Sequence, residues 1–301
     1  MIAFSVVTQL ILAVMYLYIW RSVLRSLATT KALRIIVAGI VFTSWSTSLM
    51  PLFLRNNWAS QLTDALSWLI YLNLGFFSLV FVGAIVKDLA SFLLMLLHRA
   101  IKHPRKNIAN PDRRELFKYS LNAGIIGISG TLTHSGVKQA TQGLIDKTVT
   151  IPIANLPKAL ESLRIVQFTD LHVGPTIKID YVEEVVARIQ SLRPDVIVMT
   201  GDLVDGSVKH LENDVEPLRN LTAASGKFFI TGNHEYHSGV EAWMDKIRDL
   251  GFIILLNEHR LFSFQGEPWL LAGVPDYHAE RYFRHINPIR PKPFTAHRVW
   301  R

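Results

Sequence analysis

Cysteine is absent from this chain of 301 residues. Its absence excludes a disulfide framework, thiolate metal sites and a cysteine nucleophile. It leaves the compartment open, because a chain without cysteine suits either side of a membrane.

Charge is also scarce, at 19% of residues, whereas soluble domains carry about 25%. Half of the residues are apolar and the mean hydropathy is +0.24. Up to residue 150 the chain has 5 Asp and Glu against 15 Lys and Arg. From residue 151 onward it has 19 Asp and Glu against 17 Lys and Arg. The basic excess therefore lies between apolar runs, as in membrane proteins, and not on a globular domain, so nucleic-acid binding is not expected.

Residues 1–138 are predicted to form an all-α membrane region of three to four transmembrane helices. Residues 2–20 form an uncharged run that is long enough to cross the hydrocarbon core as a helix. Residues 35–54 and 66–86 form similar runs. The third run continues to residue 97 and is predicted to be one long helix. A cleavable signal peptide is the alternative for the first run, which lacks a basic start and a small-residue cleavage site.

The distribution of basic residues predicts the orientation of these helices. Basic loops at residues 21–34 and 99–118 are expected in the cytoplasm, with the N-terminus outside. Arg113 and Arg114 precede a weakly apolar stretch, residues 119–132, and resemble a twin-arginine export signal. An ordinary fourth helix is the alternative. If residues 119–132 cross the membrane in either way, the rest of the chain lies on the extracytoplasmic side of an inner membrane. If they do not cross it, the rest of the chain stays in the cytoplasm.

The pattern changes after a linker and lead-in strand predicted over residues 139–162. Three short apolar runs follow, at residues 164–169, 195–200 and 227–231, and the segments 180–192 and 214–224 between them have helical spacing. Strand–helix alternation predicts parallel pairing, with the carboxyl ends of the strands at one ligand-binding edge. Each run ends in a polar cluster, and the clusters hold Asp170 and His172, then Asp202 and Asp205, then Asn233, His234 and Glu235.

These residue types favour a metal centre. Asp170, His172, Asp202 and Asn233 offer oxygen and nitrogen ligands without sulfur, which suits hard or borderline divalent ions. Asp202, on the middle strand, is the natural bridge between two ions that clamp a phosphoryl group. His234 is placed to face a substrate and to act in catalysis.

Four segments together resemble the calcineurin-like metallophosphoesterase superfamily, and its membrane-anchored bacterial branch in particular. Residues 166–174 read VQFTDLHVG, residues 201–206 GDLVDG, residues 232–235 GNHE and residues 271–276 LAGVPD. The resemblance implies an α/β domain with a two-layer mixed sheet flanked by helices, two divalent ions (manganese, iron, zinc or magnesium) and phosphoester hydrolysis. It also implies that Asp170 and His172 bind the first ion, that Asn233 binds the second, and that Asp205 and Glu235 lie behind the ligands.

The sequence departs from the family after residue 282. The expected Gly-His-x-His motif is absent, and residues 283–301 form a basic, proline-rich tail. The domain, residues 163–282, is therefore expected to be incomplete at its C-terminus, as a truncated or frame-shifted product would be. The second ion is expected to bind weakly or not at all. Among the remaining histidines, His278 is the candidate for a substrate contact.

These features predict a membrane-anchored, metal-dependent phosphoesterase, impaired by the missing ligands. A tether at the lipid bilayer favours a phosphodiester or pyrophosphate substrate, which can be lipid-linked, as in UDP-diacylglucosamine hydrolases. The alternative is a membrane protein that retains the phosphoesterase fold without catalysis.

Overall fold

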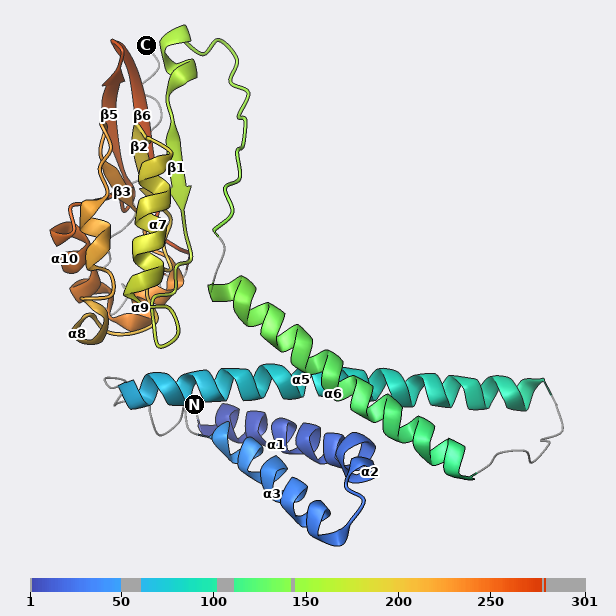
Figure 1. The fold of residues 1–301 in the computed structure, drawn as a ribbon. Helices are drawn as coiled ribbons and strands as arrows, with labels where there is room; N and C mark the ends of the chain where they lie inside the picture. The colour runs from blue at the N-terminus through green and yellow to red at the C-terminus, as the bar shows by residue number, and fades with distance from the viewer. Residues whose placement is uncertain (1, 50–60, 102–110, 142–143, 278, 280–301) are drawn as a thin grey trace. The chain divides into compact units, whose positions relative to one another are not determined.

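The computed structural model describes residues 2–49, 61–101, 111–141, 144–277 and 279 (Figure 1). The chain divides into two compact units, Met1–Thr141 and Gln142–Arg301.

All the regular secondary structure in the described part of the N-terminal unit is helical. Its elements are α1 (Ile2–Ile19), the π-helix η1 (Trp20–Leu24), α2 (Arg25–Leu27), α3 (Lys31–Thr47), α5 (Gln61–Ala100) and α6 (Pro111–Thr141). The prediction that the third apolar run continues to residue 97 as one helix is confirmed, because α5 is unbroken over 40 residues. The second apolar run is helical up to Thr47, and its end lies among the residues that are not described.

Two stretches of this unit are long and apolar enough to cross a membrane, Val6–Leu27 and Thr63–Ala100, considering only the described residues. Helices α3 and α6 do not meet this criterion over their described parts. Helix α3 has 17 residues, and α6 begins with charged residues and contains four glycines.

The core of this unit lies between α1 and α5, which run side by side. Tyr16 contacts Phe77 at 4.9 Å between ring centroids, and Tyr18 contacts Phe81 at 5.6 Å. Because the residue numbers increase in the same direction along both helices, from Tyr16 to Tyr18 and from Phe77 to Phe81, the two helices are parallel. A large aromatic pair of this kind contributes about 0.5–1.5 kcal/mol beyond its buried area.

The C-terminal unit is an α/β domain. Its helical elements are η2 (Lys158–Ser162, a 3₁₀ helix), α7 (Ile179–Ser191), α8 (Val208–Leu211), η3 (Glu216–Asn220, a 3₁₀ helix), α9 (Asn233–Ser238) and α10 (Val240–Asp249). Its strands are β1 (Ile165–Phe168), β2 (Val196–Met199), β3 (Lys227–Phe229), β4 (Ile253–Ile254), β5 (Glu258–Phe264) and β6 (Glu267–Gly273). The first four strands form one parallel sheet in the order β1-β2-β3-β4, and β5 and β6 form an antiparallel hairpin.

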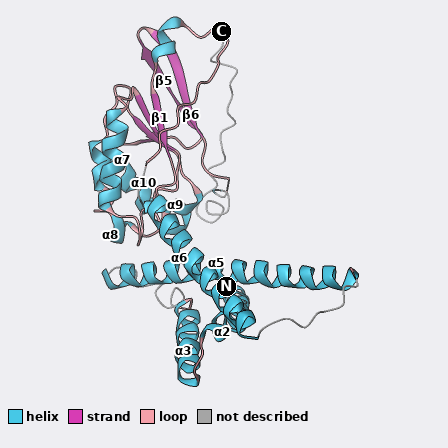
Figure 2. Ribbon diagram, turned by 45° about the vertical axis from the view of Figure 1, so that its right-hand side comes forward, coloured by secondary structure: helices cyan, strands magenta, loops and turns pink. Residues whose placement is uncertain are grey.

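Alternation along the central strands divides the core into two layers. Ile197 and Phe229 pack with α7 and α10, whose side chains fill the larger cluster. Their neighbours Val196 and Phe228 face the other way and pack with the β5–β6 hairpin. Successive strand residues point to opposite faces, so a strand covered on both sides is apolar throughout, as β2 is. Figure 2 shows α7 and α10 together beside the strands.

Three details of the predicted architecture need correction. The mixed two-layer sheet with flanking helices is, among the described residues, a parallel sheet with helices on one face and a separate hairpin on the other. The lead-in strand expected within residues 139–162 is not present in the described part, where α6 continues to Thr141 and residues 144–157 form no strand. Pro152 and Pro157 lack the N–H that a ladder needs. The helix predicted over residues 214–224 is only the short 3₁₀ helix η3, which has a proline in its first turn.

Trp243 ties helix α10 to the loop after β2. Its side chain is fully buried, and its indole N–H donates to the carbonyl oxygen of Gly206 at 2.8 Å. We expect Trp243→Phe to lower the free energy of unfolding of the C-terminal unit by about 2–3 kcal/mol, because it leaves a cavity and removes the donor from a half-buried carbonyl. Pulse proteolysis of the full chain across a urea series measures this change.

Trp269→Phe is the matched control. The indole nitrogen of Trp269 is buried without a partner among the described residues, so this substitution removes volume but no hydrogen bond. Equal losses of stability in the two variants would show that the bond to Gly206 adds nothing.

Candidate metal centre

The site lies at the edge where β1, β2 and β3 end. Because these strands are parallel neighbours, the three polar clusters converge as the sequence predicts. The first two loops continue the pairing beyond the strands, since the backbone N–H of Asp170 donates to Gly201 and that of His172 to Asp202, both at 3.1 Å. The ligand-bearing loops are therefore extensions of the sheet.

Three of the predicted ligands have left-handed backbone conformations. The φ angles are 54° at Asp170, 48° at His172 and 52° at Asp202. Such conformations cost of order 1–3 kcal/mol each in a residue other than glycine, and they persist where the surroundings enforce them. Here the bonds between the two loops hold the strained residues in place.

Asp170, His172 and Asp202 form a group that fits a divalent cation. Their potential ligand atoms all lie within 4.8 Å of one another. His172 Nε2 is 3.7 Å from Asp170 Oδ1. Two carboxylates and one imidazole nitrogen form a donor set suited to manganese, iron, zinc or magnesium.

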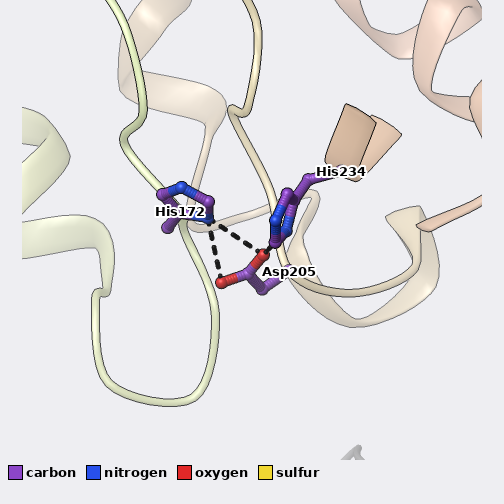
Figure 3. A group of neighbouring side chains, drawn as sticks. All are labelled: His172, Asp205 and His234. Atoms are coloured by element: carbon purple, nitrogen blue, oxygen red, sulfur yellow. Dashed lines mark hydrogen bonds and ion pairs between the residues drawn. The ribbon is translucent and has the colours of Figure 1, made fainter. Parts of the chain in front are cut away.

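Asp205 links the two histidines of the site (Figure 3). Its carboxylate Oδ1 lies 3.1 Å from His172 Nδ1 and 2.5 Å from His234 Nδ1, and the two imidazole rings meet edge to face at 4.5 Å. A carboxylate behind a metal-binding histidine fixes the tautomer and the orientation of its ring. With Nδ1 of His172 donating to Asp205, Nε2 of the same ring is free for an ion beside Asp170.

The charge around His172 changes its proton affinity. Burial lowers the pKa of His172, but the hydrogen bond to Asp205 and the charges of Asp205, Asp202 and Asp170 outweigh burial and raise the pKa above its ordinary value. Several carboxylates facing one imidazole produce a negative field, which also favours a bound cation.

Asn233 and His234 begin helix α9. The backbone N–H of His234 donates to Asp202 Oδ1 at 2.9 Å, so the start of this helix contacts the carboxylate predicted to bridge the ions. Asn233 is half-buried and directly precedes this contact. The third loop thus meets the second at Asp202.

Glu235 has a structural place behind the site. Its side chain is fully buried, and its carboxylate accepts the backbone N–H groups of Asp202 at 3.0 Å, Leu203 at 2.7 Å and Gly232 at 2.7 Å. Burial raises the pKa of Glu235, although these three bonds favour the charged form. One carboxylate therefore joins the loops after β2 and β3.

A pair of glycines allows these two loops to touch. A Cβ on Gly201, where φ is +86°, would lie 2.5 Å from the Gly232 Cα. A Cβ on Gly232 would lie 2.6 Å from the backbone nitrogen of Asp202. Only glycine fits at either position.

Two contributions to the site were missed by sequence reasoning. Thr169 donates its hydroxyl hydrogen to Asp170 Oδ2 at 2.6 Å, and the two glycines set the spacing of the loops. The signal was present, because Gly201 and Gly232 each come directly before a predicted ligand. His278 and residues 280–301, which include the predicted tail, lie outside the described residues.

Comparison with known proteins confirms the resemblance to the superfamily. Residues 163–292 match the model of the calcineurin-like phosphoesterase family. This match contains every polar cluster described above. No solved structure is significantly similar to the chain.

Several relatives are described as membrane proteins or as metallophosphoesterases. A zebrafish (Danio rerio) protein described as a transmembrane protein with metallophosphoesterase domain is 36% identical over 52% of this chain and 38% of its own length. A bovine protein of the same description is 33% identical over 56% of this chain and 43% of its own. An uncharacterized metallophosphoesterase of Campylobacter jejuni is 25% identical over 91% of this chain and 68% of its own. The chain thus spans less than half of the first two relatives.

The buried carboxylate of Glu235 generates a prediction about stability. We expect Glu235→Gln to lower the free energy of unfolding of the C-terminal unit by about 2–4 kcal/mol, because the amide offers one acceptor oxygen to three backbone donors. Urea pulse proteolysis of the full chain is the measurement. Glu258→Gln serves as control, since the Glu258 side chain is 57% exposed and its loss should change little. A Glu235 variant as stable as this control would contradict the role of Glu235.

Proposed function

We propose that the C-terminal unit hydrolyses a phosphoester and that the apolar helices of the N-terminal unit anchor it in a membrane. The observation that carries the proposal is the convergence of Asp170, His172 and Asp202, with ligand atoms within 4.8 Å of one another, next to His234. The family match and the relatives described as transmembrane proteins support the two halves of the proposal.

Asp170, His172 and Asp202 would hold one ion, and Asp202 and Asn233 would be available to a second. Bound divalent ions would polarise the phosphoryl group and make water a stronger nucleophile at neutral pH. The sequence holds no Gly-His-x-His motif, so within these 301 residues the first ion has the better set of ligands. We therefore expect one ion to bind more tightly than the other.

His234 acts on the substrate through Nε2. Its Nδ1 is engaged by Asp205 at 2.5 Å, which orients the ring and leaves Nε2 for a substrate oxygen. From there the imidazole donates a proton to the leaving group, or a hydrogen bond to the charged phosphoryl oxygens. Asp205 is a positioning residue, since it reaches the substrate only through the two histidines.

The substrate we favour is a phosphodiester or pyrophosphate, and a lipid-linked one in particular, as for a UDP-diacylglucosamine hydrolase. An enzyme tethered to a bilayer meets lipid-linked substrates in two dimensions and soluble ones only from the adjacent water. We place the domain on the extracytoplasmic side of an inner membrane. A second candidate is a membrane protein that keeps the fold without turnover.

Metal binding and turnover separate these two candidates. With manganese and bis-p-nitrophenyl phosphate, we expect His234→Ala to lower turnover at least about a hundredfold while manganese affinity changes little. Asp202→Asn should weaken both, because it removes a ligand. Equilibrium dialysis and initial rates on the full chain give the two quantities. Metal binding that depends on Asp202, without turnover in the unmodified chain, would favour the non-catalytic candidate. Turnover insensitive to His234→Ala would refute the assigned role.

The side of the membrane is tested with reporter fusions. A reporter fused after Trp20 or at His103 should be cytoplasmic, and one fused after Arg164 exported, because basic loops stay inside. Replacing Arg113 and Arg114 by lysine should block export if the twin-arginine signal operates. Unchanged export would indicate an ordinary fourth helix, since lysine keeps the positive charge. A cytoplasmic reporter after Arg164 in the unmodified chain would place the domain inside.

A further inference from the structure

The first helix of the N-terminal unit contains a π-turn. Between α1 and α2, the backbone N–H of Arg25 donates to the carbonyl oxygen of Trp20, five residues earlier. Such a turn holds one residue more than an α-helical turn, so the chain after it is rotated by about 100° relative to an unbroken α-helix. The turn therefore decides which side of the following residues faces the core.

Two side chains from other helices hold the carbonyl groups of this turn. Lys87 of α5 donates from Nζ to the carbonyl oxygen of Ser22 at 2.5 Å, and Asn122 of α6 donates from Nδ2 to that of Val23 at 3.5 Å. The Val23 carbonyl also accepts from the hydroxyl of Ser26 at 2.7 Å, and Asn122 Nδ2 donates to Ser26 Oγ at 2.5 Å. Lys87 Nζ also donates to Asn122 Oδ1 at 3.0 Å, so the two donors are joined. The Lys87 side chain is 13% exposed and Asn122 is 3% exposed.

A second set of contacts surrounds the same lysine without reaching the π-turn carbonyls. Asp88 lies 3.4 Å from Lys87 Nζ and accepts hydrogen bonds from the hydroxyl groups of Tyr18 and Ser22, both at 2.7 Å. This carboxylate compensates the charge of the lysine. The cluster thus contains two donors to the π-turn carbonyls, Lys87 and Asn122, and a carboxylate, Asp88, that only balances the charge of Lys87.

Burying polar groups between apolar helices is energetically unfavourable unless each group has a partner. An ammonium group among apolar helices must be paired or bound to carbonyl oxygens, and ionisable residues there are commonly functional. Backbone carbonyl groups away from water also need donors. Lys87 serves both needs, because its ammonium group donates to the carbonyl oxygen of Ser22.

We propose that the π-turn at Trp20–Leu24 is a register switch, held in its observed state by Lys87 and Asn122. When these two donors leave, the segment returns to α-helical bonding, and the residues after it rotate by one position. Ala28, which is 1% exposed at the end of α2, then leaves the core and the chain enters α3 from a different face. This inference is independent of the proposed phosphoesterase activity.

The absence of cysteine makes the switch measurable with a single thiol. We introduce Ala28→Cys in the full chain and follow maleimide labelling in detergent micelles. The thiol should be protected in the otherwise unmodified chain. Adding Lys87→Met or Asn122→Leu should raise its labelling rate at least tenfold. No increase in either variant would overturn the proposal.

Matched variants distinguish a register switch from a loss of stability. Tyr18→Phe and Asp88→Asn change the same cluster but leave the donors to the π-turn carbonyls in place, so they should leave Ala28→Cys protected. Ala84→Cys, at a fully buried position of α5, should stay unlabelled in all variants. Equal labelling at both thiols, or equal effects of Asp88→Asn and Lys87→Met, would show that the cluster merely stabilises the bundle and would refute the switch.

Discussion

The candidate site depends on the buried carboxylate of Glu235. The loops after β2 and β3 bring their backbones together at Gly201 and Gly232, and their N–H groups point to the same place. Without an acceptor, such a junction of donors in the interior would be unfavourable. Glu235 supplies that acceptor, and its negative charge in turn is stabilised by the donors. The ligand Asp202 is held where these interactions meet.

The sequence predicted that the polar clusters meet at one edge of the sheet, whereas several details of the surrounding fold differ from the prediction. Apolar runs ending in Asp170, Asp202 and Asn233 were enough to place these residues at one sheet edge, because parallel neighbours end together. Sequence pattern could not show that Asp205 contacts both histidines, since such a contact depends on loop conformation. The left-handed backbone at His172 was equally hidden, because local propensity disfavours it and the neighbouring loop enforces it.

The errors in the fold have a related origin. Apolar residues alternate over residues 149–153, as in a strand, but a strand needs a partner with free N–H and C=O groups, and pattern alone does not supply one. The segment around Pro217 has helical spacing, yet only a short 3₁₀ turn forms there. By contrast, α7 was predicted within one residue at each end, since its apolar face repeats over thirteen residues and packs on the sheet.

One carboxylate serving two histidines has a consequence for how the site works. His172 is a metal ligand in the proposed function and His234 faces the substrate, yet both orient their rings by binding Asp205. Any change at Asp205 therefore alters ligand geometry and acid–base geometry together, and its effects on metal affinity and turnover are coupled. Substitutions at a ligand such as Asp202 and at His234 separate what the metal contributes from what the protein's own imidazole contributes.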